Sequence, residues 1–151
     1  MFTNRYLEAE YYMVQLCNRA MELSKKCYEY CPGISLYPNE IHTVEYIAES
    51  STTNMTDIAN QMGLTKGAVS KMIAKLESQG LLERYKYQPS QKDIYVHLTE
   101  LGVQAYEGHK VYHAAMREQL NHYFEGLDPE HRKAILAFLD VYLTEMKNLK
   151  D

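Results

Sequence analysis

The 151-residue chain contains no tryptophan, four prolines, seven glycines and only three cysteines. An odd and small number of cysteines excludes a disulfide-stapled scaffold and favours a reducing cytoplasmic location. No stretch approaches the ~20 consecutive apolar residues that a membrane-spanning helix needs, so we expect no membrane partner. Charged residues at Arg5, Glu8 and Glu10 interrupt the N-terminal segment, which argues against a secretory leader.

Motifs of several large enzyme classes are also missing. The chain contains no GxSxG, P-loop, HExxH or CxxC pattern, which would supply a nucleophile, a phosphate cradle or a metal-bound water. The sequence therefore predicts a protein that is not an enzyme. The length fits one domain over residues 1–151, and a hydrophobic content of 46% argues against disorder.

Residues 55–84, MTDIANQMGLTKGAVSKMIAKLESQGLLER, are the most informative stretch. Asn54 can cap a first helix together with Asp57, and Gly63 can end that helix in a left-handed conformation. Thr65 can cap a second helix, which Gly80 ends. Apolar residues recur at helical spacing in both helices: Ile58, Ala59, Met62, Val69, Met72, Ile73 and Leu76. This pattern predicts a helix-turn-helix.

The opposite face of the second helix carries hydrogen-bonding and cationic side chains, as a helix that enters the major groove of DNA requires. The strands expected over 81–87 and 93–98 form a wing, with Gln91 and Lys92 near its tip in residues 88–92. Over both segments the predicted DNA-binding residues are Thr65, Lys66, Ser70, Lys71, Lys75, Lys86, Gln91 and Lys92.

The charge distribution agrees with a DNA-binding segment. Residues 64–93 contain six basic and three acidic residues, a net charge of +3, which leaves −7 for the rest of a chain whose total is −4. Affinity for DNA comes largely from phosphate neutralisation, so a local basic patch allows an acidic protein to bind double-stranded DNA.

Long amphipathic helices are expected on both sides of this segment. The first spans residues 3–31 and ends at Pro32–Gly33, and a second begins at Pro38 and gives way to a polar connector at 50–53. Another runs from a cap at Thr99 to residue 123 or 124, and the last starts at Asp128–Pro129. The first and last helices carry more apolar surface than the small wing domain can cover: Met13, Leu16, Ala20, Leu23, Cys27, Tyr30, Ile135, Leu136, Leu139, Tyr142, Leu143, Met146 and Leu149. These faces predict an intertwined helical dimer.

Together, the segments LYPNEIHTVEYI, residues 55–84 and VHLTELG resemble the MarR family of bacterial transcription regulators. The resemblance implies a mainly α fold with a small β-wing, in which 38–98 bind DNA and 1–37 and 99–151 form a helical dimerisation part. It also implies a homodimer on a near-palindromic operator, usually a repressor that an effector releases from or engages with DNA. By this match Ser70 and Lys71 face bases and phosphates. The wing departs from the family pattern, because Gln91 stands where the usual arginine would lie.

Histidines suggest what the effector is. His109 and His113 are four residues apart on one expected helix, a spacing that suits zinc, and His42 lies in the first turn of another. All three positions match the zinc-responsive branch of the family, which implies a further acidic ligand from the first helix. Four residues are candidates for that ligand: Glu22, Cys27, Cys31 and Glu40.

Three alternatives remain open. Cys17 resembles the thiol of the peroxide-sensing branch, which would make the protein a thiol-based peroxide sensor. Tyrosines and methionines between the two parts of the chain could line a pocket for a small aromatic effector. In the third alternative the helices serve only dimerisation, and the protein is an interaction module that does not bind DNA.

Overall fold

The computed structural model describes residues 4–51, 53–86 and 93–149. These residues form two compact units, and the division between Val111 and Tyr112 falls inside the long helix α5. The first unit carries the winged helix, and the second consists of the end of α5 and the helix α6.

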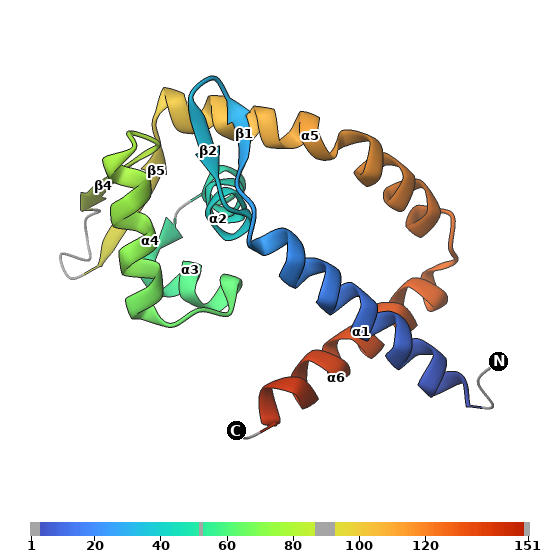
Figure 1. Cartoon of the computed structure of the whole chain (residues 1–151). Helices are drawn as coiled ribbons and strands as arrows, with labels where there is room; N and C mark the ends of the chain where they lie inside the picture. Colours follow the sequence, from blue (N-terminus) through green and yellow to red (C-terminus); the bar gives the residue numbers. More distant parts are fainter. Residues whose placement is uncertain (1–3, 52, 87–92, 150–151) are drawn as a thin grey trace. The chain divides into compact units, whose positions relative to one another are not determined.

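Most of the described residues are helical, and the few strands are short (Figure 1). The first unit comprises, in order, α1 (Arg5–Ser24), β1 (Tyr28–Cys31), β2 (Ile34–Leu36), α2 (Pro38–Glu49), β3 (Thr53–Asn54), α3 (Met55–Met62), α4 (Lys66–Ser78), β4 (Leu82–Lys86), β5 (Ile94–Leu98) and the start of α5 (Glu100–Glu125). The second unit continues α5 and adds α6 (Pro129–Asn148). The predicted fold class, mainly α with a small β-wing, is confirmed.

The helix-turn-helix forms as its capping residues predicted. Asn54 Oδ1 accepts hydrogen bonds from the backbone N–H groups of Thr56 and Asp57 at 2.8 and 3.0 Å, and Asp57 Oδ2 accepts one from Asn54 N–H. Gly63 ends α3 with a φ of 63°, in the left-handed region that a residue with a Cβ rarely adopts. These capping hydrogen bonds and the left-handed glycine fix the ends of α3 and the turn that leads to α4.

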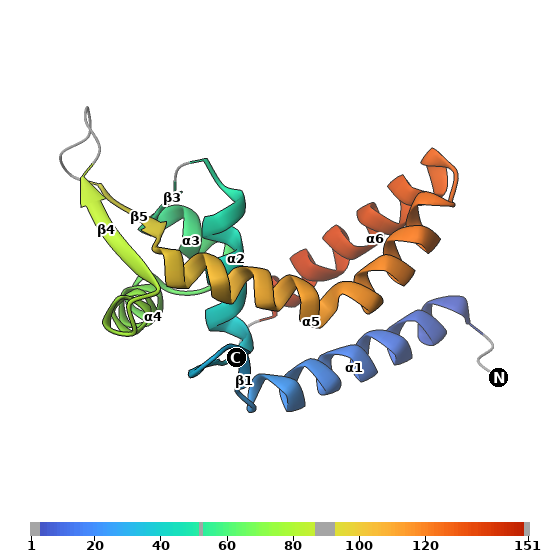
Figure 2. The same ribbon diagram turned by 90° about the horizontal axis from the view of Figure 1, so that it is seen from above.

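A single apolar core holds α2, α3, α4 and the sheet together. In the sheet β5 lies in the middle, antiparallel to both β3 and β4. Figure 2 shows the ribbon of β4 and β5 extending beyond α4, as a wing does. The predicted apolar stripe of α4 is buried at Val69, Ile73 and Leu76, while Met72 is half-buried. Because α4 buries this stripe, its other face is presented outward.

The prediction of one helix over residues 3–31 is wrong for residues 25–31. Helix α1 ends at Ser24, and Tyr28–Cys31 pair with Ile34–Leu36 as a two-stranded antiparallel hairpin. Tyr28 and Tyr30 favour extended backbone, and Gly33 supplies the hairpin turn with a φ of 78°. The apolar spacing of three and four continued across the boundary, so periodicity alone did not locate it.

The polar connector expected at 50–53 is also partly wrong. Thr53 belongs to β3, lies opposite Val96 of β5, and is only 1% exposed. The short strand was missed because two residues are too few for a period-two pattern.

Two glycines allow backbone segments to approach α5 closely. A Cβ on Gly102 would lie 2.0 Å from the carbonyl oxygen of Leu81, and one on Gly108 would lie 1.7 Å from that of Tyr30. Such distances are far inside van der Waals contact. The hairpin β1–β2 therefore packs on α5 only because residue 108 has no side chain.

The end of α5 lies one or two residues beyond the predicted residue 123 or 124, and α6 starts at Pro129 as predicted. Helix α5 stops at Glu125, one residue before Gly126, and Asp128 Oδ1 accepts a hydrogen bond from His131 N–H at 3.0 Å to cap α6. Most residues of α6 are exposed in the single chain even where they are apolar, among them Leu136, Leu139, Leu143 and Met146. Within the described ranges, no helix combines the length and the apolar character needed to cross a bilayer.

Candidate nucleic-acid interface and histidine cluster

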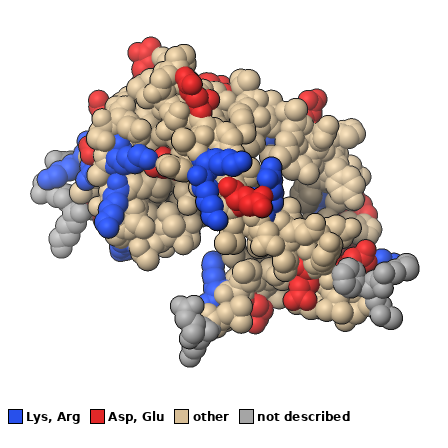
Figure 3. Space-filling view, in the orientation of Figure 1, with Lys and Arg blue, Asp and Glu red and all other residues tan. Residues whose placement is uncertain are grey.

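The outward face of α4 carries most of the residues that the sequence assigned to DNA. Thr65, Lys66, Ser70, Lys71 and Lys75 are all exposed. The N-terminus of α4 is fixed by Thr65, whose Oγ1 accepts a hydrogen bond from Ala68 N–H at 3.2 Å. Figure 3 shows Lys and Arg side chains over the part of the surface that α4 and β4 form. A rigid helix thus presents hydroxyl and ammonium groups toward solvent.

The lysines of α4 differ in their surroundings. Lys75 Nζ lies 2.5 Å from Glu40 Oε1 and 5.2 Å from the centre of the Tyr37 ring. Lys66 and Lys71 form no ion pair within the described part of the chain. Lys75 therefore joins α4 to the start of α2, whereas Lys66 and Lys71 offer their whole charge to a partner.

The wing is anchored to α4 by an ion pair. Arg84 Nε of β4 lies 3.0 Å from Glu77 Oε2 near the end of α4. Lys86, the last residue of β4, is exposed as a phosphate contact requires. Gln91 and Lys92, which the sequence placed at the wing tip, lie outside the described residues. Their predicted contact with DNA stays a prediction.

The three histidines of the predicted metal site lie together. The ligand nitrogens of His42, His109 and His113 are all within 4.8 Å of one another. His42 comes from α2, and the other two follow each other by one turn on the unbroken helix α5. The rings of His42 and His109 have their centres 5.3 Å apart, and Tyr30 of β1 packs edge-on against His109 at the same distance. Helix α2 and the hairpin therefore enclose a fully buried His109.

A carboxylate that sequence reasoning missed stands beside this cluster. Glu45 Oε2 lies 3.7 Å from Nδ1 of His109, and its side chain is 17% exposed. A carboxylate beside one ring nitrogen favours the tautomer whose other nitrogen binds a metal. The available signal was the spacing of three residues between His42 and Glu45, which brings both to one side of α2.

The four candidates for the further metal ligand have environments that differ from the histidine cluster. Glu22 forms an ion pair with Arg19 at 3.0 Å, and Glu40 also accepts a hydrogen bond from Tyr37 N–H. Cys27 is exposed between α1 and β1. Burial, followed by the Glu29 carboxylate, raises the pKa of the Cys31 thiol and disfavours the thiolate that a metal requires. None of the four belongs to the three-histidine group among the described residues.

One cysteine and one cavity bear on the alternatives to a metal effector. Cys17 is half-buried on α1, and all three cysteines are free thiols. A cavity lies within the winged-helix unit, at the end of α2. Sensing by Cys17 and binding of a small aromatic effector both stay predictions.

Comparison with known proteins concerns the helix-turn-helix region and the fold. The sequence model of the MarR family matches residues 36–92. Over 109 residues the chain is 31% identical to the uncharacterized HTH-type transcriptional regulator YhjH of Bacillus subtilis, a match that covers 72% of this chain and 62% of that regulator. The chain therefore spans less than two thirds of the length of that relative.

Two crystal structures share the fold. The zinc-responsive MarR family member ZitR of Lactococcus lactis superposes with a TM-score of 0.66 at 19% identity, covering 95% of this chain and 99% of that one. FabT of Streptococcus pneumoniae in complex with DNA gives 0.67 at 21% identity, covering 96% and 99%. At such identities the likeness concerns the fold.

Proposed function

Residues 36–92 of this chain match the model of the MarR family, and we propose that the chain is a sequence-specific, DNA-binding transcriptional regulator of this family. Its relatives and its fold are those of transcription regulators, not of enzymes. The proposal is carried by one observation: α4 buries Val69, Ile73 and Leu76 and presents Lys66, Ser70 and Lys71 outward.

In the proposed mode of binding, α4 enters the major groove. Ser70 faces base edges, where a hydroxyl can donate or accept a hydrogen bond, and Lys66 and Lys71 neutralise phosphates. The local charge of +3 makes this face attractive to DNA although the rest of the chain is acidic. FabT, which shares the fold, was crystallised in complex with DNA, which supports DNA binding by this chain.

The experiment is a gel-shift titration across salt concentrations, with the promoter region beside the protein's own gene as the probe. We expect Lys71→Ala to weaken binding and to lower the slope of log K against log salt by about 1, because one phosphate contact is lost. Lys133→Ala is the matched control, since Lys133 is an exposed lysine of α6. Unchanged affinity and slope in both Lys66→Ala and Lys71→Ala would refute the proposal.

We further propose that the regulator is a homodimer and acts as a repressor. Helices α1 and α6 have no buried residue in the single chain, although both carry large apolar side chains such as Leu16, Met21, Leu139 and Leu143. Apolar faces of this extent are covered in solution by a partner, and a second copy would hold two α4 helices roughly 34–36 Å apart on DNA.

Dimerisation and repression are tested separately. We expect sedimentation to give a dimer for the wild type and a monomer for the double variant Leu139→Glu, Leu143→Glu, with Lys133→Glu as the control. A wild-type monomer would contradict the dimer. A reporter gene under the bound promoter should rise in activity when the regulator is deleted, and a fall would contradict repression.

Zinc is the effector that we propose. Three imidazoles within 4.8 Å fit the nitrogen ligands that zinc prefers, and Glu45 stands where it favours the metal-binding tautomer of His109. When bound, zinc would supply a cross-link between His42 of α2 and the histidines of α5. Glu40 of α2 forms an ion pair with Lys75 of α4, so the position of α2 affects the position of the DNA-binding helix.

Calorimetric titration with zinc tests this proposal. His42 is exposed, so His42→Ala should leave the fold intact and lower zinc affinity at least about tenfold, while His122→Ala, on the exposed part of α5, should not. Gel shifts with and without zinc then test whether the metal alters operator affinity. Equal zinc affinity in wild type and His42→Ala would exclude this site.

A further inference from the structure

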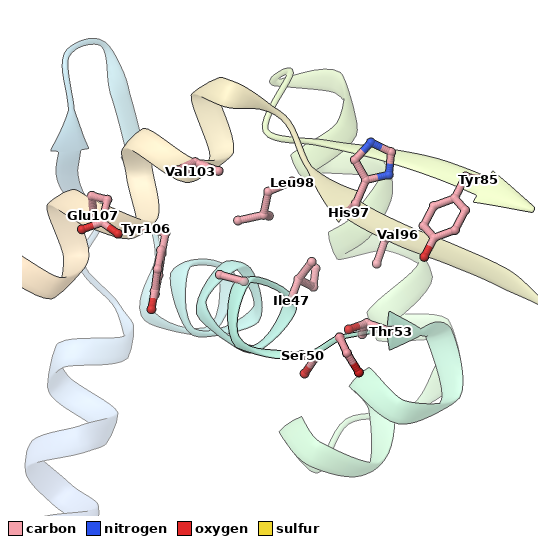
Figure 4. Close-up of a pocket in the computed structure, with 12 residues that line it drawn as sticks. Ile47, Ser50, Thr53, Tyr85, Val96, His97, Leu98, Val103, Tyr106 and Glu107 are labelled. Carbon is pink, nitrogen blue, oxygen red and sulfur yellow. The ribbon is translucent and has the colours of Figure 1, made fainter. Parts of the chain in front are cut away.

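A cavity of about 320 Å³ lies in the winged-helix unit, apart from the residues of the histidine cluster. It is formed by the end of α2, by the sheet β3–β5–β4 and by the first turns of α5 (Figure 4). The apolar side chains of Ile47, Val96, Leu98 and Val103 line it. This volume is at the lower end of the range for sites that hold small organic ligands.

One end of the cavity has a polar atom that lacks a partner. Thr53 of β3 lines the cavity and is 1% exposed, and its Oγ1 makes no hydrogen bond among the described residues. Tyr85 and His97 lie near this end in Figure 4. Because a buried hydroxyl without a hydrogen bond is unfavourable, this end is suited to a ligand group that donates to or accepts from Thr53.

The other end is aromatic and negatively charged. Tyr106 and Glu107 of α5 lie there in Figure 4, and the Tyr106 hydroxyl donates a hydrogen bond to Glu49 Oε1 at 3.1 Å. Lys110 forms an ion pair with Glu107 at 3.2 Å, and its ammonium stands 5.1 Å from the centre of the Tyr106 ring. The carboxylates of Glu49 and Glu107 and the ammonium of Lys110 together leave one net negative charge near this end. The Tyr106 ring already attracts a cation, which is the Lys110 ammonium.

We propose that this cavity binds a small aromatic ammonium compound. The ammonium group lies at the Tyr106 and Glu107 end, the ring covers the apolar wall, and a polar substituent reaches Thr53. The same carboxylates repel an aromatic anion of equal size. The site is separate from the three histidines, so the inference does not depend on zinc.

The position of the cavity connects it to the DNA-binding elements. Strand β3 continues directly into α3 at Asn54, and β5 pairs with both β3 and the wing strand β4. A ligand against Thr53 and Val96 therefore contacts the segment that sets the helix-turn-helix relative to the wing. This consequence rests on the proposed DNA-binding function, whereas binding of the ligand does not.

Three probes that differ in one end group test the proposal: tyramine (ammonium), tyrosol (hydroxyl) and 4-hydroxyphenylacetate (carboxylate). Each is titrated into the full chain without DNA, followed by NMR chemical shifts. We expect tyramine to bind at least about fivefold more tightly than 4-hydroxyphenylacetate, with tyrosol between them. The largest shifts should fall on Thr53, Val96 and Tyr106. Equal affinities, tighter binding of the carboxylate, or no shifts at these residues would overturn the proposal.

Variants separate the two ends of the cavity. Glu107→Gln should reduce the advantage of tyramine over tyrosol, while Glu100→Gln, on the exposed first turn of the same helix, should leave it unchanged. Thr53→Val keeps the shape but removes the hydroxyl, so it should weaken all three phenols. Unchanged tyramine binding in both Glu107→Gln and Thr53→Val would place the probe elsewhere and refute the site. Gel shifts with and without tyramine are a separate measurement. An unchanged DNA affinity there would contradict only the connection between the cavity and DNA binding, and not the binding of tyramine.

Discussion

Substitution of Gly108 by alanine tests the packing that encloses His109. The added Cβ would lie 1.7 Å from the carbonyl oxygen of Tyr30, whereas ordinary contact begins at 3.4 Å. The hairpin must therefore move away from α5 by more than an ångström, because a backbone atom cannot rotate aside as a flexible side chain does. The movement also shifts the Tyr30 ring, which packs 5.3 Å from the His109 ring.

The magnitude follows from two opposing effects. Alanine in a helix interior gains about 1 kcal/mol over glycine, while overpacking costs typically 1–3 kcal/mol or more. A clash with backbone belongs at the upper end of that range, so we expect Gly108→Ala to lower the free energy of unfolding by about 2 kcal/mol. For a chain of this size the melting temperature would fall by roughly 4–8 °C.

The assay is thermal unfolding followed by circular dichroism, without DNA or metal. Gly67→Ala is the matched control, because a Cβ on this helical glycine of α4 meets no atom within 4 Å. We expect the control to raise stability by about 0.5–1 kcal/mol. If Gly108→Ala is as stable as Gly67→Ala, the hairpin does not pack on α5 as described and the reasoning is refuted.

Other predictions concern single side chains. Lys75→Ala should lower both operator affinity and stability, the latter by about 1 kcal/mol in unfolding experiments, because it leaves the Glu40 carboxylate buried without its ion pair; a loss of affinity alone would contradict this role. Asn54→Ala should cost about 1 kcal/mol through loss of the α3 cap, and an unchanged denaturant midpoint would argue against that cap. The backbone N–H of His131, and then its side chain, lower the pKa of Asp128 from its ordinary 3.8. A lowered pKa gives stability that is present above the ordinary value and is lost as pH falls through the lowered one. Below about pH 4 the melting temperature of the wild type should therefore fall more steeply with decreasing pH than that of Asp128→Asn. Parallel curves of melting temperature against pH would count against this linkage.

Local sequence determined the elements whose ends are set by their own residues. Asn54, Gly63 and Thr65 fixed the helix-turn-helix, and Asp128 with Pro129 fixed the start of α6, because caps and left-handed glycines act over a few residues. The outward face of α4 followed from helical spacing alone. Composition and motif, in turn, indicated a DNA-binding protein and not an enzyme.

Features that depend on contacts between distant segments were decided by the tertiary structure alone. The hairpin at Tyr28–Leu36 could not be separated from a continuing helix by apolar spacing, since its register and its packing on Gly108 are long-range features. Likewise, spacing brought His109 near His113 and the family resemblance added His42, but only the fold places Glu45 beside His109. The ion pair of Lys75 with Glu40 and the unsatisfied hydroxyl of Thr53 were equally hidden in the sequence. A side chain's partners across 35 residues or more are set by how helices and strands pack, which no local pattern records.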